Sequence, residues 1–238
     1  MKALPFGDMA LVLEFGDQID PAINAQVQQL AAGFEALALK GVRDIVPTFR
    51  SLCLHFDPLL TDHETLEQHA RRLAAGSSQS VATGKRFVFP FLVSEAHSPD
   101  LAELSALTGL SERQVIESFC AHDLTAYFLG FVPGNAFLGQ LDPSLFVSRR
   151  AEPRVRIPPG SVATAMGLGM IYPLESPGGW HLIGHSPVPL FDLGWDQPAL
   201  LAPGDQVRFQ TVDAQAHAAL SDKLVAGMPR EAVEALLT

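Results

Sequence analysis

Clusters of proline and glycine divide the second half of this chain into short segments. Beyond Tyr127, short apolar runs are separated by clusters that read VPGN, EPRVRIPPG, ESPGG and APGD. Punctuation about every ten residues is typical of a β-barrel or a β-sandwich, whose strands are short and joined by turns. The sequence therefore predicts a mostly-β domain, which we place at residues 81–213.

The first 80 residues show a different pattern. Leu11, Leu13 and Phe15 alternate with other residues as in a strand that turns one face to a core. Asp20 and Pro21 predict the start of a helix, and apolar residues then recur at steps of three and four. A second strand follows, and TDHE at 61–64 matches a capping box for a second helix. The order predicts a small α+β domain over residues 1–80.

The stretch GSSQSVATG, residues 76–84, has the composition of a solvated link, and we place the domain boundary there. A strand is expected at about 85–93. Ser98 with Pro99, and Ser111 with Gln114, predict the starts of two short helices. The alanine-rich residues 214–238 predict a helical C-terminal tail.

The net charge of the chain excludes two classes of partner. The net charge of −10 and a pI near 5.2 argue against nucleic acid or an anionic membrane as a partner, since both would repel the chain.

Cys53 and Cys120 each lie in an apolar stretch, which predicts two reduced, buried thiols. The start lacks the unbroken apolar core of a signal peptide, and the longest apolar stretches are far shorter than a bilayer span. We expect a cytoplasmic protein.

The stretch YPLESPGGWHLIGHSP, residues 172–187, is the first candidate site. Gly178 and Gly179 permit backbone angles closed to other residues, so the stretch can be explained as a tight turn that feeds a strand. Alternatively, the glycines let a ligand approach the main chain, with Trp180 as a wall and Ser176 as a donor.

His181 and His185 have the spacing of zinc ligands on a helix, but the glycines around them make a helix improbable. Residues four apart in a regular strand share one face and lie about 13 Å apart, too far to bind one ion. We therefore expect no metal.

Two further stretches remain open between structural and binding roles. GFVPGNAFLGQLD, residues 130–142, lacks the spacing of a phosphate loop, and it is either a turn between strands or a cradle of backbone amides around Asn135. SRRAEPRVRIPPGS, residues 148–161, gathers four arginines. Guanidinium groups suit bidentate binding of a carboxylate or phosphate, but surface ion pairs with the many acidic residues are the more common explanation of such a cluster.

Together, several stretches resemble one family, that of the 5-oxoprolinase B subunit, also described as allophanate hydrolase subunit 1 or the sporulation-kinase inhibitor family. The matching stretches are FGDMALVLEFGD, DIVPTFRSLCLHFDP, GFVPGNAFLGQLD, PRVRIPPGSV, IYPLESPGGWHLIGHSPVPLFD and PGDQVRF, from about Phe6 to Val212. The resemblance implies an α+β N-terminal domain followed by a mostly-β cyclophilin-like barrel. It also implies two sister proteins, the A and C subunits, with which such proteins open 5-oxoproline to glutamate at the expense of ATP.

This chain departs from the family pattern at several positions. Asn135 and Ala136 stand where the family has part of an aromatic stretch, and Phe119 stands where it has a histidine. His181 and His185 replace a glutamine and an arginine. Because most of these changes alter groups that hydrogen-bond a small polar substrate, an alternative function stays open: a non-catalytic regulator that binds a partner such as a histidine kinase.

The resemblance and the residue chemistry together indicate a pocket for a small amide substrate. His185, as a base that titrates near neutral pH, and Tyr172 are the catalytic candidates. Arg149 and Arg154 are expected to steady a carboxylate. The substrate-binding candidates are Gly134, Asn135, Arg149, Arg154, Ser161, Ser176, Gly178, Gly179, Trp180 and His181. ATP is expected to be shared with the partner subunits, and no biotin site is expected.

Overall fold

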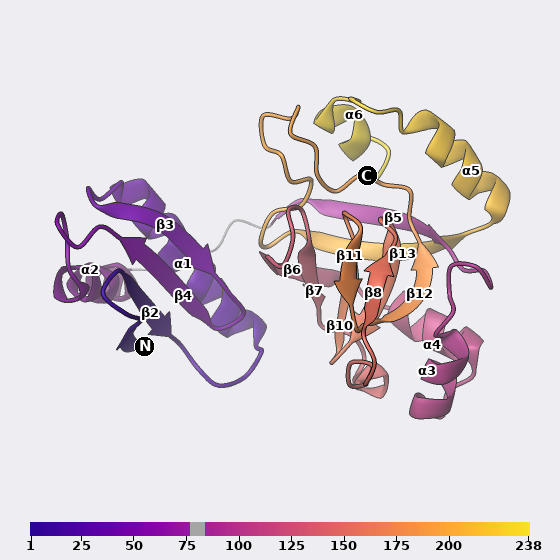
Figure 1. Cartoon of the computed structure of the whole chain (residues 1–238), viewed down its shortest axis with the longest axis horizontal. Helices are drawn as coiled ribbons and strands as arrows, with labels where there is room; N and C mark the ends of the chain where they lie inside the picture. The colour runs from indigo at the N-terminus through magenta and orange to yellow at the C-terminus, as the bar shows by residue number, and fades with distance from the viewer. Residues whose placement is uncertain (77–83) are drawn as a thin grey trace. The chain divides into compact units, whose positions relative to one another are not determined.

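The computed structural model describes residues 1–76 and 84–238. The chain divides into two compact units, Met1–Thr83 and Gly84–Thr238 (Figure 1). Most of the expected link at 76–84 lies outside the described residues. The C-terminal residues 214–238 form two helices and belong to the second unit.

The first unit contains an antiparallel sheet of four strands in the order β1-β2-β4-β3, and two helices. Leucines of β2 and β4 pack against one side of α1, which supplies Val27, Leu30 and Phe34 to the same core. The bounds are Lys2–Pro5 for β1, Ala10–Glu14 for β2, Pro21–Leu37 for α1, Val42–Pro47 for β3, Ser51–Phe56 for β4 and His63–Gly76 for α2.

The two helices of this unit begin at aspartates. Asp20 accepts hydrogen bonds from the amides of Ala22 and Ile23 at 2.7 and 3.0 Å, which satisfies two donors of the first turn of α1. In the TDHE stretch, Asp62 accepts from the amide of Thr65 at 2.7 Å. The expected capping box, which starts at Thr61, is therefore wrong by one residue.

The second unit is built on a closed barrel in the order β10-β7-β6-β13-β5-β12-β9, which confirms the predicted barrel. β5 and β13 are parallel and the other pairs are antiparallel. The bounds are Arg86–Leu92 for β5, Leu124–Leu129 for β6, Ala136–Gly139 for β7, Ser161–Ala165 for β9, Leu168–Ile171 for β10, His181–His185 for β12 and Gln206–Val212 for β13. A separate ribbon pairs β8, Arg154–Ile157, with β11, Ser176–Gly178.

Aromatic rings fill much of the barrel core. Alternate residues of β5 place Phe87, Phe89 and Phe91 in the core, fully buried. Phe209 of β13 lies 5.7 Å from Phe91 and 4.8 Å from Phe119, measured between ring centroids. Phe119, one of the departures from the family pattern, is therefore a core residue, 1% exposed.

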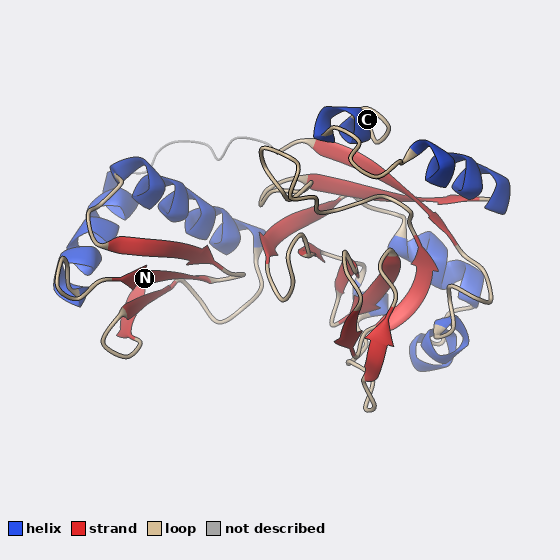
Figure 2. Ribbon diagram, turned by 45° about the horizontal axis from the view of Figure 1, so that its top comes forward, coloured by secondary structure: helices blue, strands red, loops and turns tan. Residues whose placement is uncertain are grey.

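Helices cover parts of the barrel (Figure 2). The bounds are Leu101–Thr108 for α3, Glu112–Phe119 for α4, Ala214–Lys223 for α5 and Arg230–Glu234 for α6, with a short 3-10 turn, η1, at Pro143–Leu145. Both cysteines are free thiols, and both are half-buried rather than buried as expected. In the ranges that the structure describes, no helix is both long and apolar enough to cross a membrane.

The start of α4 gives a first testable prediction. Ser111 accepts from the amide of Gln114, and the Gln114 side chain accepts from the Ser111 amide at 2.9 Å, so the predicted capping box is confirmed. Ser111→Ala should lower the free energy of unfolding by about 1 kcal/mol. Ser118→Ala, inside the same helix, should leave it unchanged or raise it slightly. Urea denaturation measures both, and equal effects would contradict the assignment of the cap.

Candidate functional site

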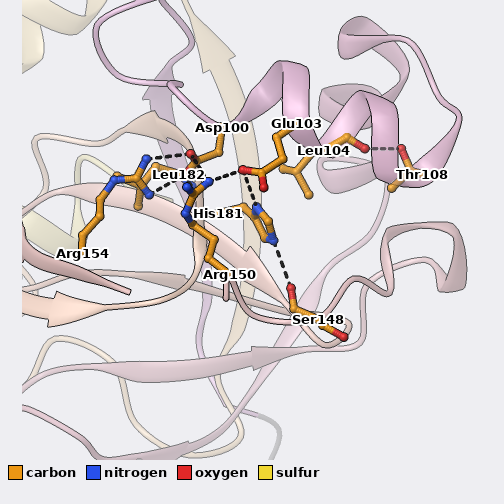
Figure 3. A network of polar contacts seen from close by, with 9 residues as sticks. All are labelled: Asp100, Glu103, Leu104, Thr108, Ser148, Arg150, Arg154, His181 and Leu182. Atoms are coloured by element: carbon orange, nitrogen blue, oxygen red, sulfur yellow. Dashed lines mark hydrogen bonds and ion pairs between the residues drawn. The ribbon is translucent and has the colours of Figure 1, made fainter. Parts of the chain in front are cut away.

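A buried carboxylate, Asp100, joins the start of α3 to β8 and β12 (Figure 3). Its Oδ1 accepts from Arg150 at 2.8 Å and from Arg154 at 2.7 Å. Its Oδ2 accepts from Arg154 at 2.8 Å and from the amide of Leu182 at 2.7 Å. Burial alone would raise the pKa of Asp100, but these donors and the two guanidinium charges lower it below its usual value. Asp100 is therefore an ionised residue that holds three parts of the chain together.

Glu103 and His181 extend this network. Arg150 also binds Glu103, one turn further along α3, and Glu103 Oε2 lies 3.8 Å from Nδ1 of His181 (Figure 3). Nε2 of His181 lies 3.0 Å from the carbonyl oxygen of Ser148. A carbonyl only accepts, so Nε2 carries the proton and Nδ1 faces the carboxylate. His181 is 1% exposed and thus belongs to the buried network.

The two glycine-containing stretches meet at Trp180. Its ring packs edge-on against Phe137, with the centroids 6.0 Å apart, which brings residues 130–142 next to residues 172–187. Trp180 is 4% exposed, and the guanidinium carbon of Arg149 lies 6.0 Å from its ring centroid. The backbone of Trp180 hydrogen-bonds to Tyr172. Burial raises the pKa of Tyr172, so the phenol is neutral at physiological pH.

Gly178 is required by its protein neighbours. A Cβ at this position would lie 2.2 Å from the hydroxyl of Tyr172 and 2.8 Å from Ile157. Gly179 differs, because a Cβ there would meet Pro153 at 3.5 Å, an ordinary contact. We expected a ligand to approach the main chain of the glycine pair. At Gly178 the group that approaches closely is the hydroxyl of Tyr172.

The remaining candidates lie at turns or within the packed interior. Asn135 is fully buried and donates to the carbonyl of Gly130 at 2.9 Å, which closes a turn in which Gly134 has a φ of +76°. Ser161 donates to the carbonyl of Pro158 at 2.8 Å. Ser176 is buried, and its hydroxyl has no hydrogen-bond partner in the described chain. An open pocket is lined by residues 129–134 and does not include Trp180 or the histidines.

His185 does not join these residues, which corrects the expectation that it shares a face with His181. The pairing of β12 with β9 shifts between Leu182 and Gly184, so that His181 lies opposite Thr164 and His185 opposite Ser161. Two residues three apart on a strand point to opposite faces, and their partners do the same. The bulge therefore directs the two histidines to opposite faces of the strand.

The surroundings of His185 also argue against its expected role as a base. Burial, followed by His97 and His217, lowers the pKa of His185 to about 4. Its Nδ1 lies 2.9 Å from Nε2 of His217, and a hydrogen bond joins it to the backbone of Pro159. A base for neutral pH needs a free nitrogen and a higher pKa.

The sequence interpretation missed Asp100 and Glu103. Asp100 directly follows the Ser98–Pro99 pair and looks like an ordinary residue at a helix start, and about 50 positions separate it from its arginines. The structure divides the arginine stretch into two kinds of residue. Arg150, Arg154 and Arg156 each pair with a carboxylate, whereas Arg149 is exposed and makes no ion pair within residues 1–76 and 84–238.

Solved structures with the same fold define the class of protein. The crystal structure of TTHA0988 superposes with a TM-score of 0.76 at 34% identity, over 86% of this chain and 40% of that one. The urea amidolyase of Kluyveromyces lactis superposes with a TM-score of 0.77 over 90% of this chain and 15% of its own, but at 17% identity it shows the fold alone. The present chain thus corresponds to less than half of either chain.

Residues 1–201 match the carboxyltransferase domain, subdomain C and D, and the chain belongs to this family. Among its relatives is the 5-oxoprolinase B subunit of Escherichia coli O157:H7, 37% identical over 207 residues, which span 85% of this chain and 92% of that protein. The 5-oxoprolinase B subunit of Bacillus subtilis strain 168 is 30% identical over 228 residues, which span 91% of this chain and 95% of that protein. The resemblance found in the sequence is thereby confirmed.

Proposed function

We propose that this chain is the B subunit of an ATP-dependent 5-oxoprolinase, which acts with its sister A and C subunits to open 5-oxoproline to glutamate. Support comes from relatives that carry the name of the 5-oxoprolinase B subunit, two of which align over more than nine-tenths of their length. In this proposal the barrel is of the cyclophilin-like type, and ATP is bound together with the partner subunits in the cytoplasm.

The proposal for the site rests on Arg149, whose charge no carboxylate of the described residues neutralises. Three of the four arginines between residues 149 and 156 are neutralised by carboxylates of the chain. Arg149 is exposed and lies over the face of Trp180, where the indole orients the guanidinium group by a cation–π contact. Its charge and its hydrogen-bond donors are therefore available for a ligand.

The chemistry of the proposed substrate suits this position. 5-Oxoproline carries one carboxylate. The sequence led us to expect that Arg149 and Arg154 bind it together, and we now propose Arg149 alone as its partner. Arg154 is proposed to act indirectly, because both of its terminal nitrogens bind Asp100. Trp180, whose ring centroid lies 6.0 Å from the guanidinium carbon, is proposed to form the wall beside it, together with the adjacent Gly179 and with Tyr172 behind them.

Reconstitution of the complex tests the proposed activity. The A and C subunits are purified with this chain, and glutamate release from 5-oxoproline is measured with and without ATP. The expected result is glutamate formation that requires ATP and all three proteins. If the assembled complex releases no glutamate, the proposed activity is wrong.

Arg149→Ala tests the site within the active complex. A charged hydrogen bond to a carboxylate contributes about 1.5–3 kcal/mol, so kcat/KM for 5-oxoproline should fall about 10- to 100-fold, mainly through KM. Arg156→Ala is the matched control, because Arg156 lies in the same segment and pairs with the exposed Glu175. Equal activity of the two variants would remove Arg149 from the site while leaving the proposed function in place.

A further inference from the structure

The side chains of three histidines from separate parts of the second unit lie next to one another. His97 lies in the turn after β5, His185 ends β12, and His217 lies in the first turn and a half of α5. Their ring centroids are 4.8 Å apart for His97 and His185, 5.1 Å for His185 and His217, and 6.2 Å for His97 and His217. We call these three residues the histidine cluster.

The hydrogen bonds of the cluster cannot all be kept when both His185 and His217 are protonated. A proline has no backbone N–H, so the bond between His185 and the backbone of Pro159 is donated by the ring to the carbonyl. The other nitrogen of His185, Nδ1, then accepts the hydrogen from Nε2 of His217 at 2.9 Å. When both rings are protonated, Nδ1 of His185 and Nε2 of His217 are both donors, and this bond is replaced by contact between two donors.

No opposite charge in the described parts of the chain compensates for these protons. The groups whose charge acts on His185 are His97 and His217, and the group that acts on His217 is His97. Glu95 lies on the same turn as His97, and Asp213 caps α5, but neither forms an ion pair with the cluster in residues 1–76 and 84–238. Burial lowers the pKa of His185 to about 4, and burial also lowers the pKa of His217.

Helix α5 is held to the barrel by few apolar contacts, from the partly buried Leu220 and from Leu224 at its end. No residue of α5 is buried, and Leu220 packs against the core only in part. The chain that follows is anchored firmly, since Val233 and Leu237 are buried and Trp195 donates to the carbonyl of Met228 at 2.8 Å. Both ribbon views show α5 lying along the side of the barrel formed by β5 and β13 (Figures 1 and 2).

We propose that α5 is an acid-released strap: protonation of the histidine cluster detaches α5 from the barrel and uncovers His185, while α6 stays packed. The sign follows from the direction of the shifts. In the detached state His185 and His217 titrate near the ordinary value of an imidazole, about 6.5. The attached state is therefore fully favoured above that pH and loses its advantage as the pH falls toward 4. This device is independent of the proposed enzymatic activity.

Hydrogen exchange of the full chain, with each rate divided by the intrinsic rate at the same pH, tests the strap. Between pH 7 and pH 4.5 the protection of the α5 amides should fall at least about tenfold. The amides of β5 and β13 should keep their protection. Loss of protection in α5, β5 and β13 together would indicate global unfolding and overturn the proposal, as would unchanged protection of α5.

The double substitution His185→Gln with His217→Gln isolates the role of the cluster, because it removes both imidazoles whose pKa is lowered. Two glutamine amides can still hydrogen-bond to each other and do not titrate in this range, so the fall in α5 protection should shrink to less than about threefold. His122→Gln is the control, because His122 is exposed and lies outside the cluster. It should keep the full pH dependence of the unaltered chain. A double glutamine variant that still loses tenfold protection would show that groups outside the cluster release α5 and would overturn the proposal.

Discussion

Asp100→Ala is expected to lower the free energy of unfolding of the second unit by about 3 kcal/mol, which corresponds to a fall in Tm of about 6–12 °C. The substitution leaves the guanidinium groups of Arg150 and Arg154, about a quarter exposed, without their shared carboxylate. It also leaves the amide of Leu182 without its acceptor. Thermal unfolding followed by circular dichroism measures the loss.

An exposed ion pair provides the comparison. Arg156 and Glu175 also form a bidentate contact, through Nε and one terminal nitrogen, but their side chains are 75% and 52% exposed. Glu175→Ala should therefore change the free energy of unfolding by less than about 0.5 kcal/mol. Similar losses for the two substitutions would mean that burial of Asp100 does not determine its contribution.

Gly178→Ala is expected to cost about 3 kcal/mol, because a Cβ would lie 2.2 Å from the hydroxyl of Tyr172 and cannot be accommodated without movement of β8 or β11. Gly179→Ala, one residue later, should be nearly neutral, since a Cβ there makes only an ordinary contact with Pro153. Urea denaturation of the two alanine variants gives a comparison at adjacent positions.

A double substitution identifies the cause of the loss at Gly178. Tyr172→Phe removes the hydroxyl that the new Cβ would meet, although the ring carbon behind it remains 2.9 Å away. The double variant should therefore recover about 1 kcal/mol relative to the sum of the single effects. Strict additivity would show that Ile157, or the backbone itself, is the source of the strain.

The fold could be predicted where local pattern determines it. Proline and glycine between short apolar runs predicted a β-barrel or a β-sandwich, because such residues interrupt strands and form the turns between them, and the family resemblance selected the barrel. The Asp20–Pro21 pair and the Ser111–Gln114 pair predicted helix starts, because a cap needs only the next three residues. The resemblance, rather than local pattern, assigned residues of both glycine-containing stretches to one pocket, and the packing of Phe137 on Trp180 brings the two stretches together.

The site could not be predicted where it depends on distant residues or on an irregular strand. Nothing local indicates that Asp100 pairs with Arg154, 54 residues later. The faces of His181 and His185 are reversed relative to each other by a single bulge, which the alternation of residues does not reveal. His217 joins His185 across 32 residues and a whole strand, so the histidine cluster had no signature in the sequence.

The position of β5 within the barrel has a consequence for how the protein is made. Both neighbours of β5 come from the end of the chain: β12 begins at His181 and β13 at Gln206. While the chain emerges from the ribosome, the run FVFPFLV therefore remains without partners during synthesis of about a hundred further residues. Apolar strands exposed in this way aggregate readily, so the yield of this protein in cells should depend on chaperones that hold nascent chains.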